Sequence, residues 1–267
     1  MLKVGACQFH VTSNIKKNLE IMEKAIQSAA SQGVSLLVFP ECACTGYPPR
    51  DMERSSAIDF EELSNVHRTL QCLASKLNMY IITGTIVKTE HKYLNSAMIC
   101  SPDQEIQFYH KRALWGWDQD NFSAEDSSGI LKIKGLKIGI RICFEVRFPE
   151  YFRELYKKHT DLNIILFYDA SDHEDKDRYE LIRSHIRTRA VENVTYTLTV
   201  NTASLYQTAP TALYDRSGHT MAELERHRED ILVYCLEKQP LNFGEKGRKE
   251  FSDILIMANM TESEYEK

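Results

Sequence analysis

The sequence has no long hydrophobic run and no extended basic stretch. In 267 residues, no apolar run approaches the ~18 residues that a membrane-spanning helix needs. No cluster of lysine and arginine is long enough to follow a phosphate backbone, and the formal net charge is −5. We therefore expect neither a membrane nor a nucleic acid as a partner.

A disulfide framework and a complete metal-binding motif are also missing. The seven cysteines are odd in number and scattered, and the N-terminus has the pattern of a strand without signal-peptide features. Such thiols are typical of reduced, cytoplasmic proteins. Cys42 and Cys44 resemble half of a metal site, but no second cysteine pair or nearby histidine completes it. We expect a cytoplasmic protein that binds no metal.

Strand and helix patterns alternate along the chain, without an internal repeat or a linker. Hydrophobic residues make up 43% and charged residues 27%, which is typical of a globular protein. Strands are predicted at 3–11, 34–39, 80–87, 95–100, 105–111, 136–142, 162–167, 194–200, 211–214 and 229–236, and helices at about 14–33, 59–78, 149–158 and 178–193. Because hairpins interrupt the alternation, a mixed sheet pair with helices outside fits better than a purely parallel sheet. Residues 112–129 are expected to be irregular, and no clear periodicity remains after Pro240.

Cys143 stands between an apolar strand and a helix. Leu136 to Ile142 alternate as strand residues do, and Pro149 is suited to the first turn of a helix. A corner of this kind exposes a side chain and can aim backbone N–H groups at one spot, which suits a nucleophile. The alternative is a buried structural cysteine.

Two further polar residues, Glu41 and Lys111, also end predicted strands. Side chains at neighbouring strand ends can meet at one rim of a sheet. A thiol nucleophile needs a group that accepts its proton, and none of the nine histidines stands in a signature that pairs with Cys143.

Four motifs in order resemble those of the nitrilase superfamily, the carbon–nitrogen hydrolases. The resemblance spans about residues 3–236, and a single motif would be weak evidence. The motifs are Phe39-Pro40-Glu41 followed by Thr45-Gly46-Tyr47, Tyr109-His110-Lys111, Cys143-Phe144-Glu145 with Arg147-Phe148-Pro149-Glu150, and Arg189-Ala190-Val191-Glu192-Asn193.

The resemblance implies an α/β fold, a four-layer αββα sandwich, and a catalytic set without a cofactor. Glu41 would be the general base, Cys143 the nucleophile, and Lys111 with the backbone N–H of Phe144 the oxyanion donors. Lys111 and the downstream helix N-terminus should favour the thiolate of Cys143. The implied reaction is hydrolysis of a small amide or N-carbamoyl amine through a thioester. A nitrilase and a catalytically idle binding module of the same fold are the alternatives.

Several residues are candidates for the substrate site. Asp118 falls where many members of the family have a second glutamate, and the Pro-Gly pair that often follows is missing. Tyr47 and Trp117 are candidate pocket residues, although a tryptophan can equally cover the core. Asp169 and Asp172 follow a buried strand, so we expect them to favour a substrate with a cationic end.

The resemblance also implies a homodimer that pairs helices with helices. The predicted contact is formed by residues 149–158 and 178–193, which carry apolar residues around much of their circumference. We expect a hydrolase domain over residues 1–240. Residues 241–267 would form a C-terminal extension that can reach a partner chain.

Overall fold

Two six-stranded sheets form the centre of the computed structural model, which describes residues 1–265 and the side chains of residues 1–257. The strands are β1 Leu2–Gln8, β2 Leu36–Val38, β3 Tyr80–Lys88, β4 Tyr93–Cys100, β5 Gln107–His110, β6 Ile130–Ile133, β7 Leu136–Ile142, β8 Leu162–Leu166, β9 Tyr196–Val200, β10 Ala212–Tyr214, β11 Thr220–Glu223 and β12 Asp230–Leu236. The helices are α1 Ile15–Ser31, α2 Phe60–Leu77, α3 Trp117–Asn121, α4 Pro149–Lys157, α5 Lys176–Glu192 and α6 Phe243–Tyr265. One sheet has the order β12-β1-β2-β3-β4-β5 and the other β11-β10-β9-β8-β7-β6.

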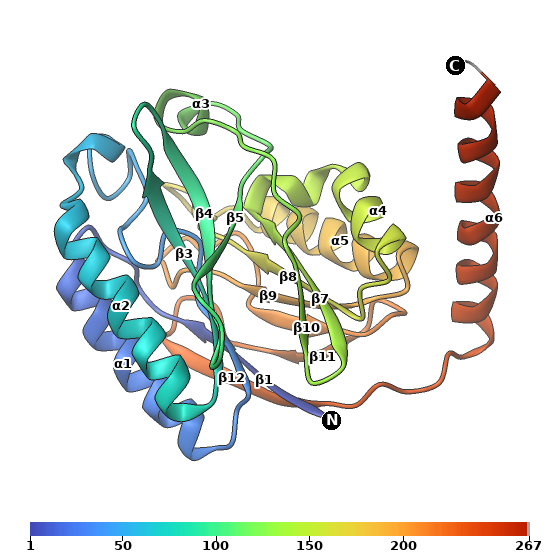
Figure 1. Cartoon of the computed structure of the whole chain (residues 1–267), viewed down its shortest axis with the longest axis horizontal. Coiled ribbons are helices and arrows are strands. Elements are labelled where there is room, and N and C mark those ends of the chain that lie inside the picture. The colour runs from blue at the N-terminus through green and yellow to red at the C-terminus, as the bar shows by residue number, and fades with distance from the viewer. Residues whose placement is uncertain (266–267) are drawn as a thin grey trace.

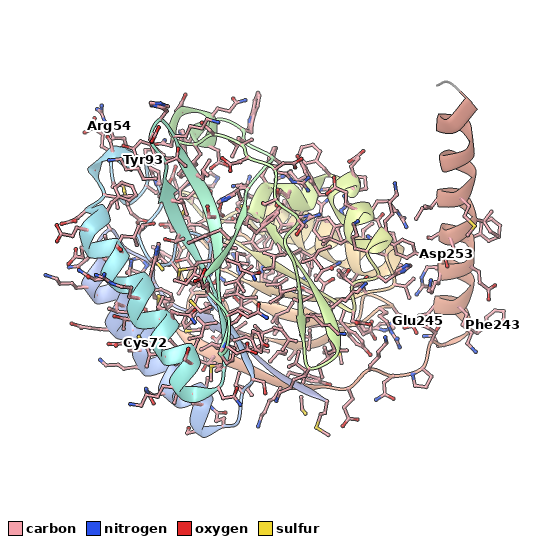
Figure 2. The ribbon with its side chains drawn as sticks, viewed as in Figure 1. Arg54, Cys72, Tyr93, Phe243, Glu245 and Asp253 are labelled. Carbon is pink, nitrogen blue, oxygen red and sulfur yellow. The ribbon has the colours of Figure 1, made fainter. Side chains whose placement is uncertain are left out.

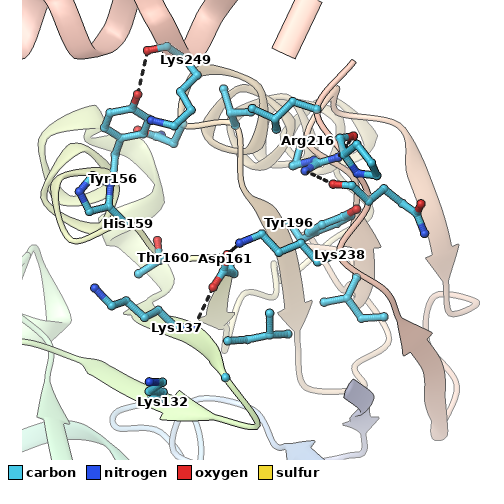
Figure 3. A pocket seen from close by; sticks show the side chains of 18 residues that line it. Lys132, Lys137, Tyr156, His159, Thr160, Asp161, Tyr196, Arg216, Lys238 and Lys249 are labelled. Carbon is cyan, nitrogen blue, oxygen red and sulfur yellow. Dashed lines mark hydrogen bonds and ion pairs between the residues drawn. The ribbon is translucent and has the colours of Figure 1, made fainter. Parts of the chain in front are cut away.

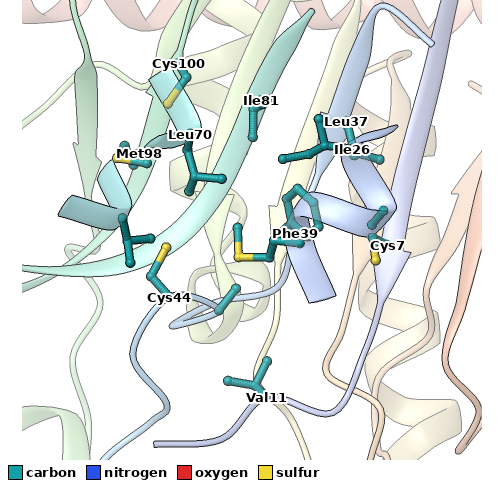
Figure 4. Close-up of a cluster of buried hydrophobic side chains, with 14 of the residues drawn as sticks. Cys7, Val11, Ile26, Leu37, Phe39, Cys44, Leu70, Ile81, Met98 and Cys100 are labelled. Carbon is teal, nitrogen blue, oxygen red and sulfur yellow. The ribbon is translucent and has the colours of Figure 1, made fainter. Parts of the chain in front are cut away.

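Three apolar clusters hold four layers together (Figure 1). The first lies between α1, α2 and the first sheet and contains Ile26 and Leu70 (Figure 4). The second joins the two sheets through residues such as Val4 and Ile140. The third lies between the second sheet and helices α4 and α5, and includes Ile186. The predicted αββα sandwich is confirmed.

Parallel pairing brings strand ends to common edges of the two sheets. In the first sheet β1, β2 and β3 are parallel, and in the second β7, β8 and β9 are parallel. The strand β8 is buried along its whole length, as expected for a strand with helices on one side and a sheet on the other. Glu41 follows β2 and Cys143 follows β7, so both lie beyond the carboxyl end of a parallel strand.

The chain that carries Glu41 lies directly against β3 at Gly84. The N–H of Gly84 donates to the carbonyl of Pro40 at 2.9 Å, and its carbonyl accepts from the N–H of Cys44 at 3.0 Å. A Cβ atom on Gly84 would lie 2.2 Å from the backbone nitrogen of Cys42. Glycine is therefore required for this approach, which holds the backbone of Glu41 in place.

The sequence after Pro240 shows no clear periodicity, but in the structure most of this segment is the helix α6. This helix stands beside the sandwich in Figure 1, and contacts it mainly through polar groups near its N-terminal half. Arg216 pairs with Glu245 at 3.2 Å, and the hydroxyl of Tyr156 donates to Asp253 at 2.6 Å. Glu245 and Asp253 face the sandwich, whereas Phe243 points away from it (Figure 2). The part of α6 next to the sandwich packs through polar contacts, so no apolar repeat marked its start in the sequence.

Three short elements lie outside the predicted ranges, and one of them is the four-residue strand β6. Residues 112–129 contain α3, which is only five residues long, and β11 is a four-residue edge strand. Elements this short cannot carry a recognisable periodicity. In residues 1–265, no helix combines the length and apolar character needed to cross a membrane.

Candidate active site

Three charged side chains lie in direct contact inside the sandwich. The Nζ atom of Lys111 is 2.8 Å from Oε1 of Glu41 and 2.7 Å from Oδ2 of Asp118. All three residues are at least 97% buried, with exposed fractions of 1%, 0% and 3%. A buried ammonium is stable only where carboxylates compensate the loss of water. Burial alone would lower the pKa of Lys111, but Glu41 and Asp118 outweigh it, so the pKa lies well above its usual value.

Glu41 is held by donors on both carboxylate oxygens. Its Oε1 accepts from Lys111 and from Nδ2 of Asn95 at 2.7 Å, and its Oε2 accepts from the N–H of Tyr168 at 2.9 Å. Burial raises the pKa of this carboxyl, Lys111 opposes the rise, and the charge of Asp118 adds to it. Glu41 is thereby suited to hold a proton transiently near neutral pH.

Asp118 reaches Lys111 although its side chain is shorter than glutamate. The short helix α3 carries it to the site, and the hydroxyl of Tyr47 donates to its Oδ1 at 2.7 Å. Tyr47 in turn stacks on Tyr168, with ring centroids 5.1 Å apart. Asp118 and Tyr47 thus form one hydrogen-bonded wall that fixes the ammonium of Lys111.

Cys143 begins the 3-10 turn Cys143–Arg147, at the corner between β7 and α4. Its φ is +44°, a strained conformation for a residue with a side chain. The half-buried thiol lines a cavity of about 410 Å³ together with Lys111, Asp118 and the side chain of Phe144. The structure therefore brings Cys143 and the charged cluster to one cavity.

The sequence led us to expect that the thiolate of Cys143 is favoured, but its surroundings in the structure favour the protonated thiol. Burial raises the pKa of the thiol well above its usual value, the charge of Glu41 raises it further, and Lys111 opposes the rise. Lys111 fails to dominate because two carboxylates already contact its ammonium. The thiol is thus protonated at rest and needs a base when it reacts.

The outer wall of the cavity carries the remaining predicted side chains and several arginines. Trp117 lines it and is 46% exposed, so it does not cover the core. Asp169 also lines it, but Arg178 holds its Oδ1 with two donors at 3.0 and 2.9 Å. The side chain of Asp172 is 83% exposed, lies outside the cavity lining, and pairs with Arg50 at 2.9 Å. Each aspartate therefore has an arginine partner in this structure.

A larger cavity, of about 500 Å³, lies at the opposite ends of the strands (Figure 3). It is bordered by the first residues of β7 and β9, Leu136 and Tyr196, and by the chain that leads to α6. Its ionic contacts include Lys238 with Asp161 at 2.6 Å. None of the described residues that line it is a cysteine, so the candidate chemistry belongs to the smaller cavity.

A sequence model described as carbon–nitrogen hydrolase matches residues 3–239. The chain belongs to the carbon–nitrogen hydrolase family. This confirms the resemblance indicated by the four motifs.

Curated relatives of this carbon–nitrogen hydrolase include enzymes named as amidases. A deaminated glutathione amidase of Synechocystis is 27% identical over 220 residues, which cover 73% of this chain and 75% of the relative. An omega-amidase of Xenopus tropicalis is 26% identical over 218 residues, covering 75% and 74%. A nitrilase of Pyrococcus abyssi is 29% identical over 192 residues, covering 69% and 68%.

Solved structures of the same fold include the NitN amidase of Neterenkonia sp. AN1. It has a TM-score of 0.80 and 20% identity, with 89% of this chain and 93% of that chain covered. A variant of the Nesterenkonia amidase, with a TM-score of 0.82, 18% identity and 97% of both chains covered, carries the acetamide moiety of fluoroacetamide on its active-site cysteine. These similarities establish the fold of the hydrolase.

Glu145 has a structural role in the hydrolase that the sequence patterns did not indicate. Its Oε1 accepts from the hydroxyl of Tyr109 at 2.7 Å and from the N–H of Arg112 at 2.9 Å. Its Oε2 accepts from the N–H of Ile142 at 2.7 Å. This fully buried carboxylate ties the residue before Cys143 to the residue after Lys111. The only sequence signal for this role was the position of Glu145 in the Cys-Phe-Glu motif. Its hydrogen-bond partners could not be predicted, because two of the three lie 30 or more residues away in the sequence.

Proposed function

We propose that the chain is a cysteine-dependent amidase that hydrolyses a small amide or an N-carbamoyl amine. The main support is that Cys143 lines one cavity with Lys111 and Asp118, and that the ammonium of Lys111 also contacts the buried carboxylate of Glu41. The amidase names of the relatives from Synechocystis and Xenopus tropicalis add support.

In the first step, Cys143 is the nucleophile and Glu41 the general base. The thiol proton moves to Glu41 while the sulfur attacks the substrate's carbonyl carbon. The π electrons of the carbonyl move to its oxygen, which becomes an oxyanion. Lys111 and the backbone N–H of Phe144 donate to this oxygen, and each such donor is worth about 2.7–4 kcal/mol in related sites. Asp118 keeps Lys111 in position.

In the second step, the tetrahedral intermediate collapses. The C–N bond breaks, and the leaving nitrogen takes the proton from Glu41 and departs as ammonia or an amine. Glu41 then accepts a proton from water as the water oxygen attacks the thioester. Return of that proton to the sulfur releases the carboxylic acid and regenerates the thiol. The raised pKa of Glu41 suits a carboxyl that gains and loses a proton twice in one cycle.

A panel of primary amides, N-carbamoyl amines and nitriles, assayed for ammonia release, tests the function. We expect release from members of the first two classes and none from the nitriles. The Cys143→Ala protein serves as the blank for ammonia that arises without the enzyme. Release from nitriles alone would identify a nitrilase instead, and a silent panel would favour an idle module.

We also place the enzyme in the cytoplasm. All seven cysteines are free thiols, four of them buried. Reduced cysteines of this kind are typical of proteins in a reducing compartment.

Self-association is proposed to occur through α6 together with the α4–α5 face. In α6, Phe251, Ile254 and Leu255 are 68%, 59% and 59% exposed and follow the i, i+3, i+4 spacing of one helix face. On α5, Leu181 is 49% exposed. Most of the other apolar residues that suggested an interface, among them Ile182, are already buried within one chain, so α6 contributes most of the apolar surface.

Light scattering at micromolar concentration should give about twice the chain mass of 30.9 kDa. Exchange of Ile254 for lysine should shift the particle toward the monomer, because a charge cannot be buried in an apolar contact without a partner. Lys24→Glu, a charge reversal at an exposed position of α1, is the control. A wild-type mass near 31 kDa would contradict the dimer.

A further inference from the structure

We infer that the larger cavity, at the strand ends opposite Cys143, binds a phosphate monoester of a small organic molecule. Lys132 and Lys137 hold the phosphate, and apolar side chains cover the organic part. The site is separate from the catalytic cavity, because Leu136 at the start of β7 lines the larger cavity and Cys143 follows the other end of that strand. The seven residues of β7 span roughly 23 Å, which is too far for one small ligand to reach both cavities.

Lys132 and Lys137 form a pair of like charges on the cavity wall. Strands β6 and β7 are antiparallel and place Lys132 directly opposite Lys137, so the two side chains leave the same face of the hairpin. Both residues line the cavity. Like charges at directly opposite positions repel each other and destabilise a sheet. An anion between the two ammonium groups replaces this repulsion with two attractions.

The charge of this lysine pair is not neutralised by the side chains of residues 1–257. Lys132 has no ionic partner among them, and Nζ of Lys137 donates to the carbonyl of Lys158 at 3.0 Å. Asp161 is the one carboxylate among the described residues that line the cavity. Its Oδ1 pairs with Lys238 at 2.6 Å, and its Oδ2 accepts from the backbone N–H of Lys137 at 2.9 Å. Two ammonium charges therefore remain for a ligand.

The cations of the cavity favour a phosphate over a carboxylate. The guanidinium of Arg216, which also lines the cavity, lies 3.2 Å from Glu245 and donates to the carbonyls of Gln239 and Pro240 at 2.9 and 3.0 Å. Its planar fork, the group that best matches a carboxylate, is therefore already occupied. The lysine ammonium groups remain, and lysine binds phosphate as a point charge. Two of them match the charge of a phosphate monoester, which is about −1.5 to −2 at pH 7.

The rest of the cavity is suited to an organic group. Its lining includes the half-buried apolar side chains of Leu136, Val194 and Leu241, and a ligand that covers them removes apolar surface from water. The volume of about 500 Å³ is typical of sites for small molecules and far exceeds that of a free phosphate ion. Figure 3 shows Lys238 and Lys249 at the border of the cavity. Since Lys249 belongs to α6, a bound ligand also connects this helix to the sandwich.

Calorimetry with the full chain tests the site, with phenyl phosphate and AMP as probes. The tighter-binding ester should have a Kd at least about tenfold below that of inorganic phosphate, the scale of burying one ring. Phenol and adenosine, which lack the phosphate, should bind more weakly than their esters by at least a similar factor. The double substitution Lys132→Gln/Lys137→Gln should raise the Kd of the tighter ester at least about tenfold, the scale of losing charge-assisted hydrogen bonds.

Two control variants locate the binding. Lys76→Gln/Lys157→Gln removes two exposed lysines that line neither cavity, and Arg50→Gln removes a cation from the catalytic cavity. Both should leave the Kd of the ester unchanged. If either control raised the Kd as much as loss of Lys132 and Lys137 does, the inference would be overturned, because the ester would then bind elsewhere or through general charge.

Two further outcomes would also overturn the inference. Inorganic phosphate that binds as tightly as the esters would contradict an organic ligand, and failure of both esters to bind at millimolar concentration would contradict the site itself. None of these measurements requires hydrolysis of an amide, so their failure leaves the proposed amidase function in place. Conversely, a chain without amidase activity can still bind the esters.

Discussion

Replacement of Cys143 by alanine or serine is expected to abolish hydrolysis while the chain remains folded. Among the described residues that line the cavity, Cys143 is the one thiol, and transfer of its proton to Glu41 would generate the nucleophile. A serine hydroxyl is far less acidic, so Glu41 cannot activate it in the same way. Loss of the nucleophile in hydrolases that act through a catalytic triad costs on the order of 10⁶ in kcat, and we expect a loss of at least ~10⁴.

Ammonia release at saturating substrate measures this loss, and thermal unfolding checks that the fold is retained. The left-handed conformation of residue 143 is no harder for alanine or serine than for cysteine, so Tm should change little. Cys72→Ser is the control, because this thiol is exposed on α2 (Figure 2) and is not among the residues that line the cavity. A Cys143→Ser chain with near-normal turnover would refute the nucleophile assignment.

Glu41→Gln and Lys111→Ala should each lower kcat at least about a hundredfold. Glutamine keeps the shape of Glu41 but cannot take the thiol proton, and the contribution of a general base is typically 10²–10⁴-fold. Removal of Lys111 takes away one donor to the oxyanion, which costs a similar factor. Steady-state kinetics on the best amide of the panel measures both losses.

Stability and pH dependence distinguish the two variants. Lys111→Ala leaves Glu41 and Asp118 buried without their shared cation, and breaking a buried pair costs about 3–5 kcal/mol, so its Tm should fall more than that of Glu41→Gln. A base works only when deprotonated, so wild-type activity should fall as pH drops through the raised pKa of Glu41. This acid limb should be absent from the residual activity of Glu41→Gln. Glu20→Gln, exposed on α1, is the neutral control, and an unchanged rate for either active-site variant would contradict its role.

The arrangement of charges explains why the thiol is not activated in advance. In many thiol enzymes a neighbouring cation lowers the pKa of the cysteine. Here the cation contacts two carboxylates, and the pKa of Cys143 is raised by burial and by Glu41. Proton removal is therefore coupled to attack. A protonated thiol at rest is also less exposed to oxidation, which proceeds through the thiolate.

The sequence patterns indicated a pair of mixed sheets with helices outside, and the resemblance of four motifs added the four layers and three candidate residues of the site. Alternating and helical periodicities are local properties of the chain, so they located most of the strands and helices. Glu41, Lys111 and Cys143 were recognisable because each follows a strand within a short motif. Glu41 and Lys111 follow strands β2 and β5 of one sheet, whereas Cys143 follows β7 of the other, so the sequence indicated the three residues but the stacking of the two sheets brings them together.

Only the tertiary structure decided how these residues are partnered. Asn95 and Lys111 reach Glu41 from 54 and 70 residues away, and Glu145 is bound by Tyr109 across 36 residues. Such contacts depend on how whole layers stack, and no local pattern records them. The same holds for Asp169 and Asp172, which looked like free acids in the sequence but are each paired with an arginine. Which charged side chains remain without an ionic partner depends on the pairs that form on folding. The distribution of charge on the cavity wall therefore could not be predicted from the sequence.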